Sequence, residues 1–211
     1  RREPLFDRLV AAVKMIREAG IQPHIIPTAH GGNIDALGEY VALADSLGAT
    51  MNFSLLSAPV ENEDLSAVLP DDAALERLAQ ATLALSRDGV PVLSDTPVST
   101  RLTTTCGCGA GCTMVSVSAD GEVFPCHMMH DEAFSLGSLL EDSGCLAARH
   151  APAPRVAELG ACADCDIRYL CGGGCRARAY FATGDVEARD PYCSLVRTFY
   201  RLLFEAMLAR N

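Results

Sequence analysis

The chain has 211 residues, of which 49% are hydrophobic, and its 27 acidic and 17 basic residues give a formal net charge of −10. The apolar content supports a folded core and argues against a globally disordered chain. The acidic balance argues against binding to nucleic acid or to an anionic membrane, because both need a basic surface. No segment has the apolar length of a membrane-spanning helix.

The N-terminal part of the sequence alternates between helix and strand patterns. Apolar residues recur at helical spacing over 6–16, and a short buried strand is expected over 23–28. A second helix is expected over 34–47, with Asn33 as its cap, and a second strand over 50–56. Such alternation predicts parallel strands joined by helical crossovers. Ligands of such sheets bind at the C-terminal ends of the strands.

A third helix pattern begins at the two aspartates 71–72 and continues to Leu85, after a loop over 58–70. Acidic residues in its first turn suit the helix dipole. Residues 89–101 contain two prolines and are predicted to form a linker, so we expect a domain boundary near residue 90.

The second part of the sequence begins with a hairpin pattern. Val115 and Val117 alternate with serines, the dipeptide Asp120-Gly121 is a turn signal, and a return strand begins at Val123. Helical patterns follow over 134–140 (one turn), 176–182 and 194–210.

The ten cysteines all follow residue 105, and no secretory signal opens the sequence. Disulfides would not have to gather in one half of a chain, so we interpret the thiols as reduced and metal-bound, in a cytoplasmic protein. Five are separated by two, five, three and seventeen residues: Cys162, Cys165, Cys171, Cys175 and Cys193. An upstream group contains Cys106, Cys108, Cys112 and Cys126. Thiolates at this density are typical ligands of soft metals or iron–sulfur clusters.

The spacing of the downstream run resembles the SPASM domain of radical S-adenosylmethionine enzymes. Upstream, Cys108, twelve residues, Gly121, four residues and Cys126 match a pattern of the same family, as does the Asp-Gly turn followed by Val-Phe-Pro-Cys. Residues 1–90 resemble, more loosely, the last strands and helices of the radical SAM partial barrel. The resemblance implies an α/β fold, with the C-terminal segment of a partial (β/α) barrel over 1–90. A small α+β cysteine-rich iron–sulfur (SPASM) domain would then occupy 91–211.

The resemblance also assigns cluster ligands by position. What we call the second auxiliary site comprises Cys162, Cys165, Cys171 and Cys193. The first auxiliary site comprises Cys108, Cys126 and Cys175, with Cys106 or Cys112 as a fourth ligand, or with three thiolates only. Each site would hold one [4Fe-4S] cluster. Thr28, Asn33 and Ser54, at the strand ends of the barrel part, are candidate contacts of S-adenosylmethionine. No catalytic residue is assigned.

The sequence departs from the family in one respect, because it lacks the Cys-x3-Cys-x2-Cys loop. In the family this loop holds the cluster that cleaves S-adenosylmethionine, whereas here no cysteine precedes Cys106. The sequence opens inside a helix pattern without a start methionine, so we expect the C-terminal part of a longer enzyme, inactive alone. That enzyme would carry a third [4Fe-4S] cluster and S-adenosylmethionine. It would modify a ribosomally synthesised peptide or protein, supplied with electrons by a donor such as flavodoxin or ferredoxin.

Two other classes of protein stay open at this point. A stand-alone iron–sulfur module for electron transfer or binding needs no radical chemistry. A structural zinc domain is the third reading, since Cys-x2-Cys pairs also bind tetrahedral zinc. Metal and sulfide analysis separates these readings.

Overall fold

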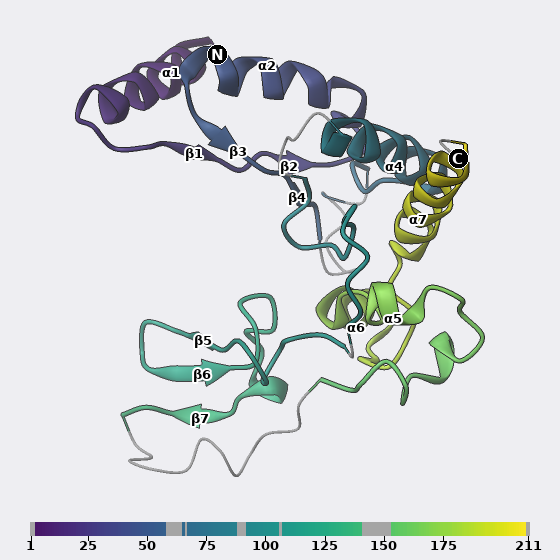
Figure 1. Cartoon of the computed structure of the whole chain (residues 1–211). Helices are drawn as coiled ribbons and strands as arrows, with labels where there is room; N and C mark the ends of the chain where they lie inside the picture. Colours follow the sequence, from purple (N-terminus) through teal and green to yellow (C-terminus); the bar gives the residue numbers. More distant parts are fainter. Residues whose placement is uncertain are drawn as a thin grey trace. The chain divides into compact units, whose positions relative to one another are not determined.

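The computed structural model describes residues 3–57, 65, 67–87, 92–105, 107–140 and 153–209 (Figure 1). These residues form two compact units. The first contains the described residues up to 57, those between 65 and 101, and 194–209, and the second contains those from 102 to 193. Among the described helices, none has the length and apolar character needed to cross a membrane.

The first unit combines helices with short parallel strand pairs. Its elements are α1 (Glu3–Glu18), β1 (His24–Ile25), β2 (Thr28–Ala29), η1 (Ile34–Ala36), α2 (Leu37–Leu47), β3 (Thr50–Met51), β4 (Ser54–Leu55), α4 (Asp72–Arg87) and most of α7 (Cys193–Leu208). β1 pairs with β3, and β2 pairs with β4, both in parallel. The prediction of parallel strands joined by helical crossovers is thereby confirmed, although each expected strand forms two short pieces.

The helix boundaries of this unit follow local chemistry. Gly48 ends α2 with a φ of 61°, in the left-handed region that glycine tolerates. The carboxylate of Asp71 accepts a hydrogen bond from the backbone N of Ala74 at 2.7 Å and so caps α4. The expected side-chain cap by Asn33 is wrong, because η1 begins without one. The Asn33 side chain instead accepts from His30 N at 2.8 Å and donates to Thr28 O at 2.9 Å.

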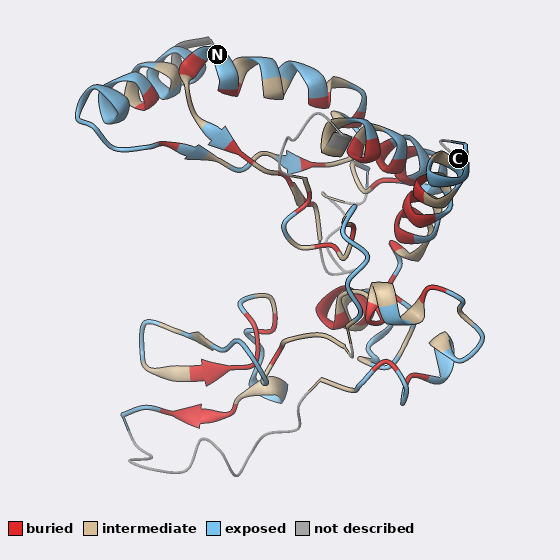
Figure 2. Cartoon of the chain, in the orientation of Figure 1, coloured by how far each residue is buried: buried red, intermediate tan, exposed pale blue. Residues whose placement is uncertain are grey.

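The boundary between the units differs from the one near residue 90. Residues 92–95 belong to the first unit, where Leu93 forms a parallel bridge with Phe53 and the carboxylate of Asp95 accepts a hydrogen bond from Leu55 N at 2.9 Å. The sequence predicted a linker there because its prolines hide the strand signal of Leu93, the one residue that forms the bridge. The apolar face of α7, including the fully buried Phe199, also belongs to the first unit (Figure 2).

The second unit contains one antiparallel sheet and several short helices. Its elements are β5 (Ser116–Val117), β6 (Glu122–Phe124), η2 (Glu132–Phe134), β7 (Gly137–Ser138), η4 (Gly160–Cys162), α5 (Arg168–Cys171) and α6 (Arg176–Thr183). The predicted hairpin is confirmed, with Val117 opposite Val123. The helical turn expected over 134–140 is wrong, because β7 pairs with β6 and Leu136 N donates to Val123 O at 2.8 Å.

Candidate functional site

Three cysteines predicted for the first auxiliary site meet in one apolar cluster of the second unit. Cys126 is buried there with Ala110, Met129 and Ala177, and the partly buried Cys108 and Cys175 pack against it. The Cys126 Sγ lies 3.7 Å from Nδ1 of His127. β6 brings Cys126 to this place, and the start of α6 brings Cys175, so the fold gathers thiols that are far apart in sequence.

The two candidates for a fourth ligand of that site differ in position. Cys112 is exposed, in a turn in which its backbone N donates to Gly109 O at 3.0 Å. That turn adjoins Ala110 of the apolar cluster. Cys106 lies outside the described residues.

The cysteines predicted for the second auxiliary site lie on neighbouring turns. Cys162 ends η4, and its carbonyl accepts from Cys165 N at 3.1 Å, while Cys171 ends α5 and Cys193 begins α7. Burial raises the pKa of the Cys171 thiol to about 12, and the negative charges of Cys193, Asp190 and Cys162 act in the same direction. Cys162 and Cys193 therefore each lie within electrostatic range of Cys171, and metal binding at Cys171 must displace a firmly held proton.

A glycine loop, Gly172–Gly174, connects the two auxiliary sites between Cys171 and Cys175. The three φ angles are 69°, 88° and 74°, all in the left-handed region. A Cβ added to them would lie 2.7, 2.5 and 2.5 Å from atoms of Thr105, Leu159 and Asp190, respectively. All three glycines therefore adopt dihedrals that residues with a Cβ rarely populate, and at Gly174 an added Cβ would also meet the hydrogen-bonded Asp190 carboxylate.

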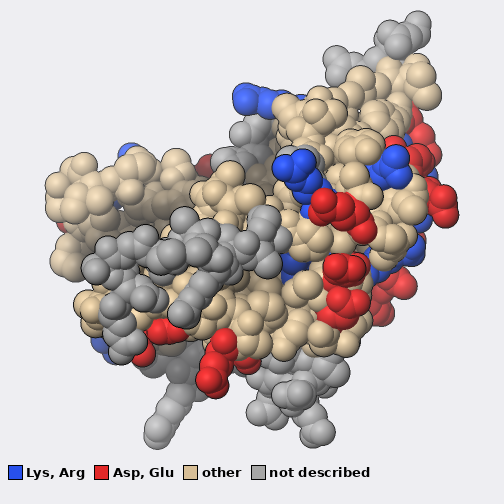
Figure 3. Space-filling model, turned by 90° about the horizontal axis from the view of Figure 1, so that it is seen from below, with Lys and Arg blue, Asp and Glu red and all other residues tan. Residues whose placement is uncertain are grey.

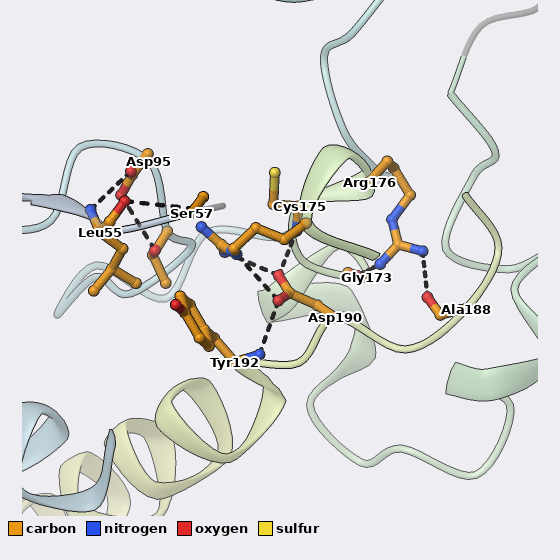
Figure 4. Close-up of polar contacts among 11 residues, drawn as sticks. Leu55, Ser57, Asp95, Gly173, Cys175, Arg176, Ala188, Asp190 and Tyr192 are labelled. Carbon is orange, nitrogen blue, oxygen red and sulfur yellow. Dashed lines mark hydrogen bonds and ion pairs between the residues drawn. The ribbon is translucent and has the colours of Figure 1, made fainter. Parts of the chain in front are cut away.

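Two buried arginines on α6 make different contacts beside this loop (Figure 4). Arg176 is 1% exposed and donates to the carbonyls of Val186 and Ala188, each at 2.8 Å, and to that of Gly173. Arg178 is 2% exposed and forms an ion pair with the buried carboxylate of Asp190, at 2.9 Å between Nη2 and Oδ2. Neither side chain faces solvent.

The donor chemistry fits iron–sulfur clusters. Soft thiol ligands stand in two sets, the first of them within an apolar cluster, and the buried Nε of Arg176 has no hydrogen-bond partner. Among the described residues, no three Cys, His, Asp or Glu side chains converge to hold a single metal ion. A cubane places each thiolate on a different iron, so its ligands surround a volume and do not have to meet at a point.

The three candidate contacts of S-adenosylmethionine lie together in the first unit. Thr28 of β2 stands opposite Ser54 of β4, and the Asn33 side chain donates to Thr28 O at 2.9 Å. Sequence reasoning missed Asp95, whose carboxylate binds the backbone of Leu55, next to Ser54. It also missed Asp190, for which the only sequence signal is its position three residues before Cys193.

A cavity of about 640 Å³ opens beside the first auxiliary site within the second unit. Its apolar walls include Met129, Phe134 and Tyr180, and the last two rings meet edge to face with centroids 4.7 Å apart. His130 and the exposed Asp131 add polar groups. Methionine and aromatic walls with few polar groups are typical of ligand pockets.

On the face drawn in Figure 3, acidic side chains lie beside scattered basic ones.

Comparisons with known proteins identify relatives of this chain in sequence and in structure. The chain is 28% identical over 202 residues to mycofactocin maturase MftC of Mycolicibacterium smegmatis. This alignment covers 89% of this chain and 51% of that protein. It is 29% identical over 222 residues to PqqA peptide cyclase of Granulibacter bethesdensis, covering 97% and 58%. The solved structure of anSMEcpe with bound AdoMet and Kp18Cys peptide matches with a TM-score of 0.69 at 15% identity, covering 97% and 61%. No family model matches the chain.

The class of protein follows from these relatives. They are radical S-adenosylmethionine peptide maturases, and this chain is homologous to them, so the resemblance inferred from the cysteine spacings is confirmed. The structural match shows a shared fold that mixes helices and strands. The chain spans about half the length of the curated relatives it matches.

Proposed function

We propose that this chain is the cluster-bearing C-terminal portion of a radical S-adenosylmethionine enzyme that modifies a ribosomally synthesised peptide or protein. The observation that carries the proposal is the partition of the thiols. Cys108, Cys126 and Cys175 share one apolar cluster, while Cys171 lies in range of Cys162 and Cys193. This is the division that two auxiliary [4Fe-4S] clusters require.

In the finer proposal, the first unit is the end of a partial barrel and the second unit is a SPASM domain. The parallel pairing of β1 with β3 and of β2 with β4 supports the barrel part. Thr28, Asn33 and Ser54 would then orient S-adenosylmethionine at the strand ends. A third cluster, which cleaves S-adenosylmethionine, would be held by a Cys-x3-Cys-x2-Cys loop that this sequence does not contain.

The residues of the second unit have separate roles in the proposal. Cys108, Cys126 and Cys175 hold one cluster, with Cys112 or Cys106 as a fourth ligand, while the apolar side chains around them exclude water. The glycine loop lets the backbone pass closely between the two sites. When bound, the clusters supply electron transfer or an iron that binds substrate, with electrons from a donor such as flavodoxin or ferredoxin.

The cavity beside the first auxiliary site is the proposed place for part of the peptide. The two relatives are a maturase and a peptide cyclase, and the solved structure of anSMEcpe holds a peptide. Met129 and Phe134 belong both to the cavity wall and to the apolar cluster around Cys126. An apolar side chain of the peptide would therefore lie next to the first cluster.

Metal analysis of the anaerobically purified protein tests the proposal. We expect about eight iron and eight labile sulfide for the two auxiliary clusters, with brown visible absorption. A colourless protein that binds zinc would favour the structural zinc domain instead. Iron–sulfur clusters in a protein whose complete coding sequence contains no Cys-x3-Cys-x2-Cys loop would favour the electron-transfer module.

A further inference from the structure

Asp190 connects the parts of the chain that lead into the two auxiliary sites. It is 4% exposed. Its carboxylate accepts hydrogen bonds from Cys175 N at 2.6 Å and from Tyr192 N at 2.9 Å (Figure 4). Its backbone carbonyl accepts from Cys193 N at 3.0 Å. One residue thus fixes the backbone of Cys175, from the first auxiliary site, and of Cys193, from the second.

Arg178 completes the surroundings of this carboxylate. Its Nε and Nη2 donate to the two oxygens of Asp190 at 3.1 and 2.9 Å, a bidentate geometry that holds both side chains in one orientation. The guanidinium also lies over the ring of Tyr192, at 5.0 Å from the ring centroid. The pair is almost fully buried, so solvent screens its charges little.

The buried pair places charge directly beside the predicted ligand Cys175. The carboxylate of Asp190 accepts a hydrogen bond from the Cys175 backbone, and the guanidinium of Arg178 is held against that carboxylate. Charges with so little exposure act strongly on nearby groups, because the surrounding protein screens them less than water does. The two oxygens of Asp190 accept from different backbone N–H groups, those of Cys175 and Tyr192, so asparagine, with one acceptor oxygen, could keep only one of these hydrogen bonds. The buried charges therefore point to an electrostatic role in addition to a structural one.

We propose that Asp190 and Arg178 form a positioning pair that orients Cys175 and sets the reduction potentials of the two auxiliary clusters. The inference rests on the proposed function, since it presupposes clusters at both sites. Asp190 acts on both sites, because its backbone and side chain hold Cys175 and Cys193. Arg178 acts mainly on the first site, because it lies on α6 three residues after Cys175.

Reductive titration of the reconstituted protein, followed by electron paramagnetic resonance, tests the pair. Asp190→Asn removes a negative charge, so added electrons are better accommodated and the midpoint potentials of both clusters rise. Arg178→Gln removes a positive charge, so the potential of the first cluster falls by more than that of the second. Opposite signs from two partners of one ion pair are not expected if their loss merely loosens the loop.

Matched controls come from an exposed ion pair in the first unit. Arg77 and Asp35 are 3.0 Å apart, with side chains 49% and 74% exposed, and Asp35→Asn and Arg77→Gln should leave both potentials unchanged. Arg178→Lys keeps the charge and should retain the wild-type potential of the first cluster. If Asp190→Asn does not fold, the comparison of Arg178→Lys with Arg178→Gln still tests the electrostatic role of the pair.

Two outcomes overturn the inference in different ways. Iron present at the expected level, with potentials that stay unchanged or shift in the same direction in Asp190→Asn and Arg178→Gln, rejects the pair's electrostatic role and leaves the proposed function standing. The electrostatic role is also rejected if the potential of the first cluster shifts as far in Arg178→Lys as in Arg178→Gln. Absence of iron from the unsubstituted protein rejects the proposed function and the inference together.

Discussion

Replacing Gly174 by alanine tests whether the glycine loop is shaped around Asp190. The φ of Gly174 is 74°, a left-handed conformation that costs alanine about 1–2 kcal/mol. The added Cβ would lie 2.5 Å from Oδ2 of Asp190. Hydrogen bonds from Cys175, Tyr192 and Arg178 hold that carboxylate, so it does not rotate away freely. Moving it disrupts charge-assisted hydrogen bonds worth about 1.5–3 kcal/mol.

The two contributions together predict a loss of about 2.5–5 kcal/mol in the free energy of unfolding. Gly184→Ala is the matched control, because Gly184 has a φ of 75° but nothing lies within 4 Å of an added Cβ. It should lose only the conformational part, about 1–2 kcal/mol. The difference between the variants isolates the contact with Asp190.

Thermal unfolding of the anaerobically prepared protein, followed by circular dichroism, measures this difference. For a unit of the size of residues 102–193, 1 kcal/mol shifts Tm by about 4–8 °C, so Gly174→Ala should melt about 6 °C or more below Gly184→Ala. Equal melting temperatures in the two variants would refute the role assigned to the contact between the glycine loop and Asp190.

Three further predictions concern other parts of the chain. Because burial raises the pKa of Cys171 from 9.0 to about 12, the metal-free protein should lose stability as pH rises from 9 towards 12, and a flat denaturation profile over this range would contradict that burial. Asp71→Ala removes the cap of α4 and should cost about 1 kcal/mol in urea denaturation, whereas the exposed Asp72→Ala should cost less. Tyr180→Ala should weaken peptide binding in calorimetry severalfold, and an equal effect of Tyr169→Ala, outside the residues that line the cavity, would argue against the cavity as the peptide site.

Periodic patterns predicted the long helices well. The spacing of apolar residues located α1, α2, α4 and α7, and the Asp-Gly turn located the hairpin of β5 and β6. These elements depend on contacts between residues close in sequence, which a local pattern records. Periodicity did not predict burial equally well, since Leu5 and Leu9 of α1 are 70% and 60% exposed.

The errors concern features that depend on distant parts of the chain. β7 was expected to be helical because its pairing with β6 leaves no periodic signal in two residues, Gly137 and Ser138. Residues 92–95 were expected to be a linker because their contacts with Phe53 and Leu55, each 40 residues earlier in the chain, leave no periodic signal. α7 follows the last cysteine directly, so sequence order placed it with the second unit, while its apolar face belongs to the first.

The cysteine spacings predicted which residues form the candidate site, and whether these residues bind clusters stays a prediction. Ligand spacing reflects how short loops supply several thiolates, so it indicated Cys162, Cys165 and Cys171 without any knowledge of packing. The sequence could not indicate the role of Asp190, because its partners Cys175 and Arg178 are more than ten residues away. Whether Cys106 or Cys112 completes the first auxiliary site stays a prediction.

Iron analysis of two single variants and their combination tests the central claim most directly. If the thiols hold two independent clusters, Cys126→Ala and Cys171→Ala should each lose about half of the iron and labile sulfide, and the double variant should lose nearly all. The account is contradicted if the double variant retains as much iron as either single variant, or if neither substitution changes the iron content.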